Sequence, residues 1–172
     1  MGGEGGKGVA TLGFLSVVEH ETLGLFGGLL ILNGSGRPIE FHCTAPIKPS
    51  RAQQILYGPT LEPYMYGEQI GWSLLKKTNV EPPLVLTDVR AVLAVRDFVE
   101  MPVVLVVNRR ATVEGRLFHH GVNQLTAEGT RLEDQARATA ILSDLPESFD
   151  LFEPFGRIHE AIQEAQKVGR AA

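Results

Sequence analysis

Cysteine is nearly absent from this sequence, which holds a single one, Cys43, among 172 residues. One cysteine cannot form an internal disulfide, and the N-terminus lacks the charged and apolar blocks of a secretory signal peptide. Both absences favour a protein of the reducing cytoplasm. A chain of this length buries roughly 70% of its unfolded surface, so it needs neither a disulfide nor a metal to build a hydrophobic core.

Long apolar runs and an excess of positive charge are missing as well. The strongest apolar segments, residues 29–32 and 103–107, have the length of strands, far short of the roughly 20 residues that a membrane helix needs. The net charge is -4, and no cluster of basic residues stands beside aromatic residues. Nucleic acids are bound mainly through their phosphates. The sequence therefore predicts no membrane and no nucleic acid as a partner.

Glycine and proline are abundant, with 19 and 10 residues, and this composition predicts many turns between short elements. Residues 1–8 hold five glycines and are expected to form a flexible tail. Residues 9–172 show no repeat and no linker, so we expect one domain. The predicted fold is α+β, with a mixed or antiparallel sheet of about five or six strands and helices packed on it.

Apolar alternation, turn signals and helical periodicity place the individual elements. Strands are expected over residues 12–18, 25–32, 37–44, 84–86, 103–107 and 111–119. Helices are expected over residues 50–57, 60–77, 89–99, 132–142 and 156–169.

The strand expected over residues 37–44 carries the cysteine. Side chains alternate between the two faces of a strand, so Cys43 shares a face with Ile39 and Phe41. Glu40 and His42 share the other face. The apolar neighbours of Cys43 predict that its thiol points toward the core.

The helix expected over residues 60–77 carries two candidate carboxylates. Apolar side chains recur along one seam of this helix from Leu61 onward, and Glu68 completes the seam between Met65 and Trp72. Glu68 is therefore predicted to face the core, where a glutamate needs a partner because an unpaired buried charge is costly. Glu62 lies on a polar stripe of the same helix.

Two adjacent histidines, His119 and His120, end the last expected strand. Strand alternation turns one of the two imidazoles inward. Such an imidazole is a natural partner for Glu68 and a natural base for a thiol. We therefore expect a cysteine hydrolase without a cofactor, in which Cys43 attacks an acyl carbon, His119 or His120 takes the thiol proton, and Glu68 or Glu62 orients the imidazole.

Two alternatives use the same sequence features. Cys43, His119 and His120 could bind zinc, with a glutamate as fourth ligand or base, although the short ligand spacings typical of zinc sites are missing. The chain could also be a noncatalytic scaffold module of the roadblock or longin kind, in which these residues serve only as core and surface.

The order of Cys43, then Glu62 or Glu68, then His119 and His120 resembles the CEHH proteins, a small bacterial α+β family named for those residues. The resemblance covers about residues 9–125. Members of that family are found beside genes for ubiquitin-like conjugation. The resemblance implies a hydrolase that acts on a ubiquitin-like protein or its conjugates, and it implies conjugation enzymes as partners.

Overall fold

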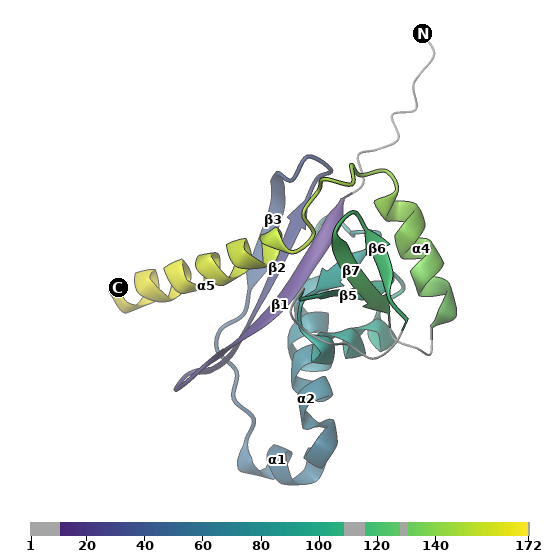
Figure 1. The fold of residues 1–172 in the computed structure, drawn as a ribbon. Coiled ribbons are helices and arrows are strands. Elements are labelled where there is room, and N and C mark those ends of the chain that lie inside the picture. Colours follow the sequence, from purple (N-terminus) through teal and green to yellow (C-terminus); the bar gives the residue numbers. More distant parts are fainter. Residues whose placement is uncertain (1–10, 109–115, 128–130, 172) are drawn as a thin grey trace.

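A computed structural model describes residues 11–108, 116–127 and 131–171, with side chains described up to residue 168. The chain forms one sheet of 7 strands in the order β3-β2-β1-β4-β5-β7-β6 (Figure 1). The strands are β1 (Leu12–His20), β2 (Gly24–Leu32), β3 (Pro38–Cys43), β4 (Val85–Thr87), β5 (Val103–Val107), β6 (Phe118–His120) and β7 (Asn123–Ala127).

The sheet is mixed. β1 pairs with β2 and β2 with β3 in antiparallel fashion, while β4 lies parallel to β1 on one side and to β5 on the other. β7 and β6 extend the sheet beyond β5 as an antiparallel hairpin. The expected mixed α+β sheet is confirmed, with more strands than the sequence predicted. The edges are β3 and β6.

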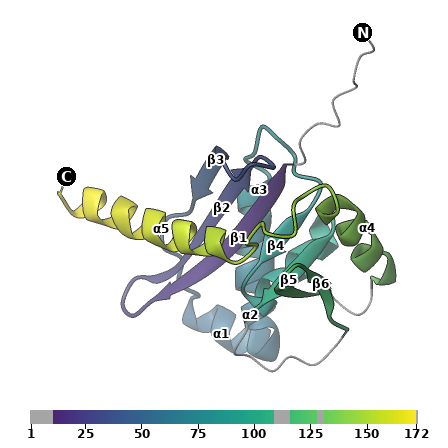
Figure 2. The same ribbon diagram turned by 45° about the horizontal axis from the view of Figure 1, so that its top comes forward.

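Helices cover both faces of the sheet (Figures 1 and 2). One face carries η2 (Tyr64–Trp72), α3 (Ser73–Leu75) and η3 (Arg90–Phe98). The segments α1 (Arg51–Tyr57), η1 (Gly58–Thr60) and α2 (Leu61–Pro63) lead into η2, and α1 lies beyond the end of the sheet (Figure 1). The other face carries α4 (Leu132–Leu142) and α5 (Glu153–Ala171). The central strands are therefore buried on both sides and contribute to two separate hydrophobic clusters. Along β1, Phe14 contributes to the cluster beneath α4 and α5, and its neighbour Leu15 contributes to the opposite cluster.

Two glycines allow helices to approach other backbone closely. A Cβ atom on Gly28 of β2 would lie 2.5 Å from Ile158 Cγ2 of α5, so α5 can rest on the sheet only because this position has no side chain. A Cβ atom on Gly67 of η2 would lie 2.9 Å from the Val95 backbone nitrogen of η3. Both contacts are shorter than ordinary packing allows, so larger residues would push these helices away.

The expected helix over residues 60–77 forms, but its middle is a π-helix. The segment η2 (Tyr64–Trp72) widens the turn, and this changes which side chains face the sheet. Met65, Ile70 and Leu74 are buried. The sequence seam assumed 3.6 residues per turn throughout. It placed Glu68 and Trp72 inward, where the structure leaves both half-buried, whereas Leu75 at the end of the seam is buried as expected.

Other differences are local. β7 was not expected, and within the helix expected over residues 89–99 the chain forms the 3-10 helix η3 in place of an α-helix. The predicted flexible tail over residues 1–8 lies outside the described residues, as do residues 111–115 of the last expected strand. None of the helices in the described part of the chain combines the length and the apolar character that a membrane span requires.

A buried ion pair connects α4 and η3. Arg96 of η3 donates from Nε and Nη2 to the two carboxylate oxygens of Asp134, at 2.8 and 3.2 Å, and from Nη1 to the carbonyl of Val99 at 2.7 Å. Arg96 is only 7% exposed and Asp134 only 1%. The bidentate geometry lets the two buried charges satisfy each other.

Asp134→Ala is expected to lower the free energy of unfolding by about 3–5 kcal/mol, because it leaves the Arg96 charge buried without a partner. Denaturant unfolding at neutral pH measures the loss. The control is Glu164→Ala, which removes an exposed pair with Lys167 and should cost less than about 1 kcal/mol. Equal costs for the two variants would show that water can replace the carboxylate at Arg96.

Candidate functional site

The structure does not bring together the residues that the sequence singled out. Cys43 ends β3, whereas His119 and His120 lie on β6, and these two strands are the opposite edges of the sheet. Six interstrand steps of about 4.8 Å separate them, a distance on the order of 30 Å. Direct proton transfer requires atoms within hydrogen-bond reach, so neither imidazole can serve the thiol.

Cys43 also does not point into a core. It is exposed, together with Ile39 and Phe41, which are 42% and 37% exposed. The alternation of the strand is as expected, but β3 is an edge strand, and α5 covers only part of its apolar face. On the other face, Glu40 accepts a hydrogen bond from His42 at 3.0 Å as well as hydrogen bonds from the backbone amides that follow α3.

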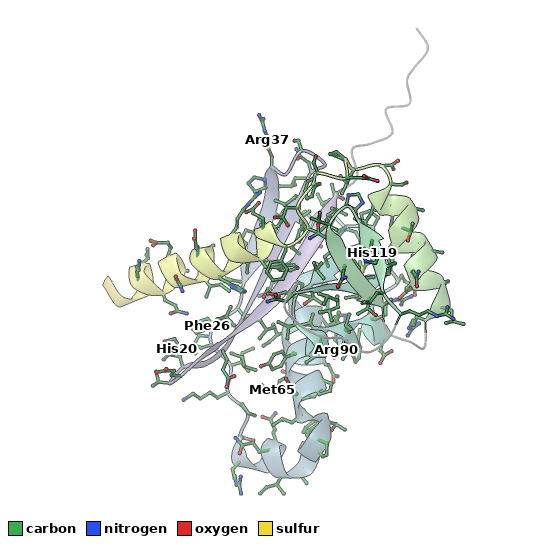
Figure 3. The ribbon with its side chains drawn as sticks, viewed as in Figure 1. His20, Phe26, Arg37, Met65, Arg90 and His119 are labelled. Carbon is green, nitrogen blue, oxygen red and sulfur yellow. The ribbon has the colours of Figure 1, made fainter. Side chains whose placement is uncertain are left out.

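The two histidines of β6 lie on opposite faces. His119 is exposed, and Figure 3 shows it well apart from His20. His120 is 7% exposed and its Nε2 donates to the carbonyl of Pro146 at 3.0 Å. His120 is thus a core histidine whose polar atom is satisfied by a loop.

The two glutamates belong to the helical segments that follow β3, and neither pairs with a described histidine. Glu68 is half-buried rather than buried, because the π-helix turns it away from the sheet, and it makes no hydrogen bond or ion pair with a described residue. Glu62 is exposed and lines a cavity of about 630 Å³ between the β1–β2 hairpin and the start of η2.

A different group of polar side chains meets beneath α5. The parallel register pairs Leu15 of β1 with Thr87 of β4, so the next residues along, Ser16 and Asp88, become neighbours on the α5 face. His159 of α5 lies directly above them. Ligand sites of sheets with parallel strands form where those strands end and neighbouring connections diverge, and Asp88 is the residue that follows β4.

The three side chains share one network. Ser16 Oγ donates to Asp88 Oδ1 at 2.7 Å, and Ser16 Oγ lies 3.1 Å from His159 Nε2. Because the serine proton goes to the carboxylate, the serine oxygen accepts from Nε2 of the imidazole. His159 Nε2 also lies 3.7 Å from Asp88 Oδ2. This arrangement assigns the ring proton to Nε2 and leaves Nδ1 of the neutral imidazole as a free base.

Burial separates the roles of the three groups. Ser16 is fully buried, the side chain of Asp88 is 12% exposed, and that of His159 is 42% exposed. Burial raises the pKa of the Asp88 carboxyl above its ordinary value, and the Ser16 hydrogen bond and the nearby His159 oppose the rise. A buried serine cannot reach a substrate as a nucleophile, so His159 is the member of the network that meets the solvent.

His159 lines a cavity of about 350 Å³ on the β1 side of α5, and His20 lines the same cavity. The ring of His20 accepts hydrogen bonds at Nδ1 from the amides of Thr22 and Leu23, at 3.2 and 3.1 Å. Its proton is therefore on Nε2, which remains a donor. The amine of Lys167 lies at the rim, 3.1 Å from Glu164.

Sequence reasoning missed this group, although two signals existed. Ser16 is a lone polar residue within the apolar strand of residues 12–18, and Asp88 directly follows a buried strand. His159 gave no signal of its own, because its position on the charged side of a helix is typical of a solvated histidine. The register between β1 and β4 was needed to connect the three.

Solved structures that resemble the fold are proteins of nucleic-acid chemistry. The catalytic domain of human endonuclease V aligns with 94% of this chain and 85% of its own, at 15% identity and a TM-score of 0.45. Endonuclease V from Ciona intestinalis, solved with a 23mer DNA that contains an inosine followed by a ribo-adenosine, aligns with 77% of this chain at 14% identity and a TM-score of 0.42. This chain spans 56% of that protein.

An Argonaute from Marinitoga piezophila, in complex with a 5′ OH guide RNA, aligns with 60% of this chain and 16% of its own, at 12% identity and a TM-score of 0.33. No protein-family model and no curated protein matches the chain. At these identities the likeness concerns the fold alone, and it transfers no residue role.

The prediction of a cysteine hydrolase for ubiquitin-like proteins was wrong. The sheet places Cys43 and the two histidines at opposite edges, so neither imidazole can activate the thiol. The alternative of a noncatalytic scaffold module does not depend on these residues meeting, and it stays a prediction. The alternative zinc ligands, Cys43, His119 and His120, are separated in the same way. Within residues 11–108, 116–127 and 131–171, no three His, Cys, Asp or Glu side chains gather in a group that could hold a metal ion.

The exclusion of nucleic acid was wrong as well, because the resembling structures include complexes with DNA and with guide RNA. The physical reason is that net charge is a sum over the whole chain. It does not describe where the positive side chains lie, and binding depends on their local arrangement. The expectation that the chain works without a cofactor remains a prediction.

Asp88→Asn is expected to stabilise the protein at pH 7. Burial holds the folded pKa of Asp88 above its unfolded value, so the ionised carboxyl destabilises the fold at any pH above both values. This cost disappears as the pH falls through the folded value toward 3.8, where the carboxyl is protonated. Asparagine carries no charge and can still accept from Ser16.

Denaturant unfolding at neutral and acidic pH measures the effect. The variant should exceed the wild type in stability at pH 7, and the gap should narrow in acid. Asp144→Asn, at an exposed position without a side-chain partner among the described residues, should change little at either pH. A less stable Asp88→Asn protein at pH 7 would mean that Ser16 and His159 outweigh the cost of burial.

Proposed function

We propose that this chain is an enzyme that binds a nucleic-acid strand in the cavity beside α5 and cleaves its phosphodiester backbone there. The observation that carries the proposal is that His159, His20 and Lys167 line one cavity, which Glu19 also lines. Asp88 Oδ2 lies 3.7 Å from Nε2 of His159. The endonuclease V and Argonaute structures described above bind DNA or RNA. Because that likeness concerns the fold alone, the proposal rests on the side chains of the cavity.

His159 is the general base. Ser16 accepts a hydrogen bond from Nε2 of the ring, and Asp88 Oδ2 lies 3.7 Å from the same nitrogen, which leaves Nδ1 to take a proton from a water molecule. The Asp88 carboxylate then stabilises the imidazolium that forms. Ser16 contacts both groups and so fixes the position of the carboxylate relative to the ring. Burial makes the charge of Asp88 effective, because water does not screen it there.

His20 and Lys167 bind the phosphate. The Nε2–H of His20 donates to a nonbridging oxygen, since backbone amides occupy its other nitrogen. The Lys167 ammonium, on an exposed side chain that pairs with Glu164, offsets the charge that develops in the transition state. These are the donor types that phosphate oxygens accept.

The reaction proceeds by one displacement. A water molecule gives a proton to His159 Nδ1, and its oxygen forms a bond to phosphorus. The bond between phosphorus and the leaving oxygen breaks, and that oxygen takes a proton from solvent. The products are a phosphate end and a hydroxyl end, and His159 returns its proton to solvent.

An exposed cysteine suits a reducing compartment, so we place the protein in the cytoplasm as part of this proposal. Membership of the CEHH proteins also remains a proposal. If it holds, the shared cysteine has a role other than attack on an acyl carbon assisted by His119 or His120.

His159→Ala is expected to lower the cleavage rate at least about 100-fold, because loss of a general base typically costs that much. The measurement uses short fluorescein-labelled strands of RNA and DNA and a DNA duplex, separated on denaturing gels, in Mg²⁺ and in EDTA.

His119→Ala is the matched control, since His119 is an exposed histidine on an edge strand of the sheet, away from α5. Its rate should equal that of the wild type. Equal cleavage by the His159→Ala and wild-type proteins, or a wild-type protein that neither binds nor cleaves any of the strands, would refute the proposal.

A further inference from the structure

A second cavity, of about 470 Å³, lies where η3 begins, and arginine dominates its polar lining. Arg90 and Arg96 come from η3, and Arg131 immediately precedes α4. Asp97 is the one acidic side chain among the described residues of the lining. Three arginines from two segments far apart in sequence therefore line one cavity.

The three arginines are in different states. Arg96 is buried and donates hydrogen bonds to Asp134 and to the carbonyl of Val99, which hold its side chain in place. Arg131 contacts Asp97 at 3.1 Å, but their side chains are 34% and 74% exposed. An exposed pair of this kind contributes less than about 1 kcal/mol, so an incoming anion can replace Asp97 as the partner of Arg131.

Arg90 is exposed and has no hydrogen bond or ion pair with any residue that the structure describes. Figure 3 labels it at the start of η3. Its guanidinium group offers a planar fork of donors, which matches two oxygens of one phosphate. Arg90 and Arg131 together can therefore bind a single tetrahedral anion beside the buried Arg96 side chain.

The position of Arg90 connects this cavity to the first. Arg90 follows Asp88 by two residues, so their Cα atoms are at most about 7 Å apart. Asp88 belongs to the network on the α5 face, whereas η3 packs on the opposite face. A nucleic-acid strand that lies across the end of β4 would therefore meet His159 on one face of the sheet and Arg90 on the other.

We propose that the Arg90–Arg131 cavity binds a second backbone phosphate of the same nucleic-acid strand whose cleaved phosphate lies at His159. This inference rests on the proposed function for its ligand. It adds a positioning contact that holds the strand in register, and it assigns the chemistry to the first cavity alone.

Arg90→Ala and the double variant Arg90→Ala/Arg131→Ala test the inference by steady-state kinetics. The single variant should raise KM about tenfold, as expected when one good phosphate contact is removed, with kcat unchanged because His159 is intact. The dependence of log KM on log salt should become shallower by about one counterion for each phosphate that the variant no longer binds. Arg90→Lys should restore part of the affinity and most of the salt dependence.

Arg51→Ala is the control, because Arg51 is an exposed arginine on α1 that contacts only Gln54 among the described residues. It should leave KM and the salt dependence unchanged. An Arg90→Ala protein with the KM and salt slope of the wild type would overturn the inference while the proposed function stands. A fall in kcat at unchanged KM would also overturn it, since it would place Arg90 in the chemistry.

Pyrophosphate titration by calorimetry separates this inference from the proposed function. The wild-type protein and the Arg51→Ala protein should bind pyrophosphate, and the double variant should bind it at least about tenfold more weakly. If no strand is bound or cleaved, the proposed function fails, and the titration then decides whether the anion site exists. Equal pyrophosphate affinity in the wild type and the double variant would refute the site.

Discussion

The burial of β1 on both faces is the constraint on which the rest of the structure depends. β1 lies between antiparallel β2 and parallel β4, so helices must cover its two sides. α5 can lie across β1 only where the side chains of the sheet are small. Gly28 of β2 and Ser16 of β1 are paired between the strands and provide such a position. The same small serine that lets α5 approach also contacts Asp88 and His159. Packing and the polar network therefore have one origin.

Much of the fold follows from the sequence. Apolar alternation located β1, β2, β3 and β5, and Ser50 with Gln53 forms the capping box that starts α1. What failed was the assignment of faces. Cys43 was expected inside because its neighbours are apolar, yet periodicity cannot tell an edge strand from a central one. Glu68 was expected inside because the helix was taken as regular, and the π-helix changed its phase.

The candidate site could not have been predicted as a unit. Ser16 lies 72 residues before Asp88 and 143 residues before His159, and only the parallel register of β1 with β4 makes the first two neighbours. The chain between β1 and β4 includes two further strands and a series of helical segments, and no local pattern specifies which strand lies beside β1. Sequence order favoured Cys43 with His119 and His120, and the sheet order separates them completely.

The positions of the charged side chains matter more for binding than the net charge of the chain does. The net charge of -4 sums all 20 acidic and 16 basic residues, whereas one cavity is lined by Arg90, Arg96 and Arg131 and the other by Lys167, His20 and His159. The chain keeps an incompletely neutralised carboxylate under α5 and an exposed guanidinium group two residues later, at the edge where β4 ends. Neither is explained by packing, since burial disfavours the charge of Asp88 and no described side chain pairs with Arg90. Under the proposed function both groups have a use, because one phosphate of the strand would lie at His159, which Asp88 supports, and the next at the Arg90 guanidinium group.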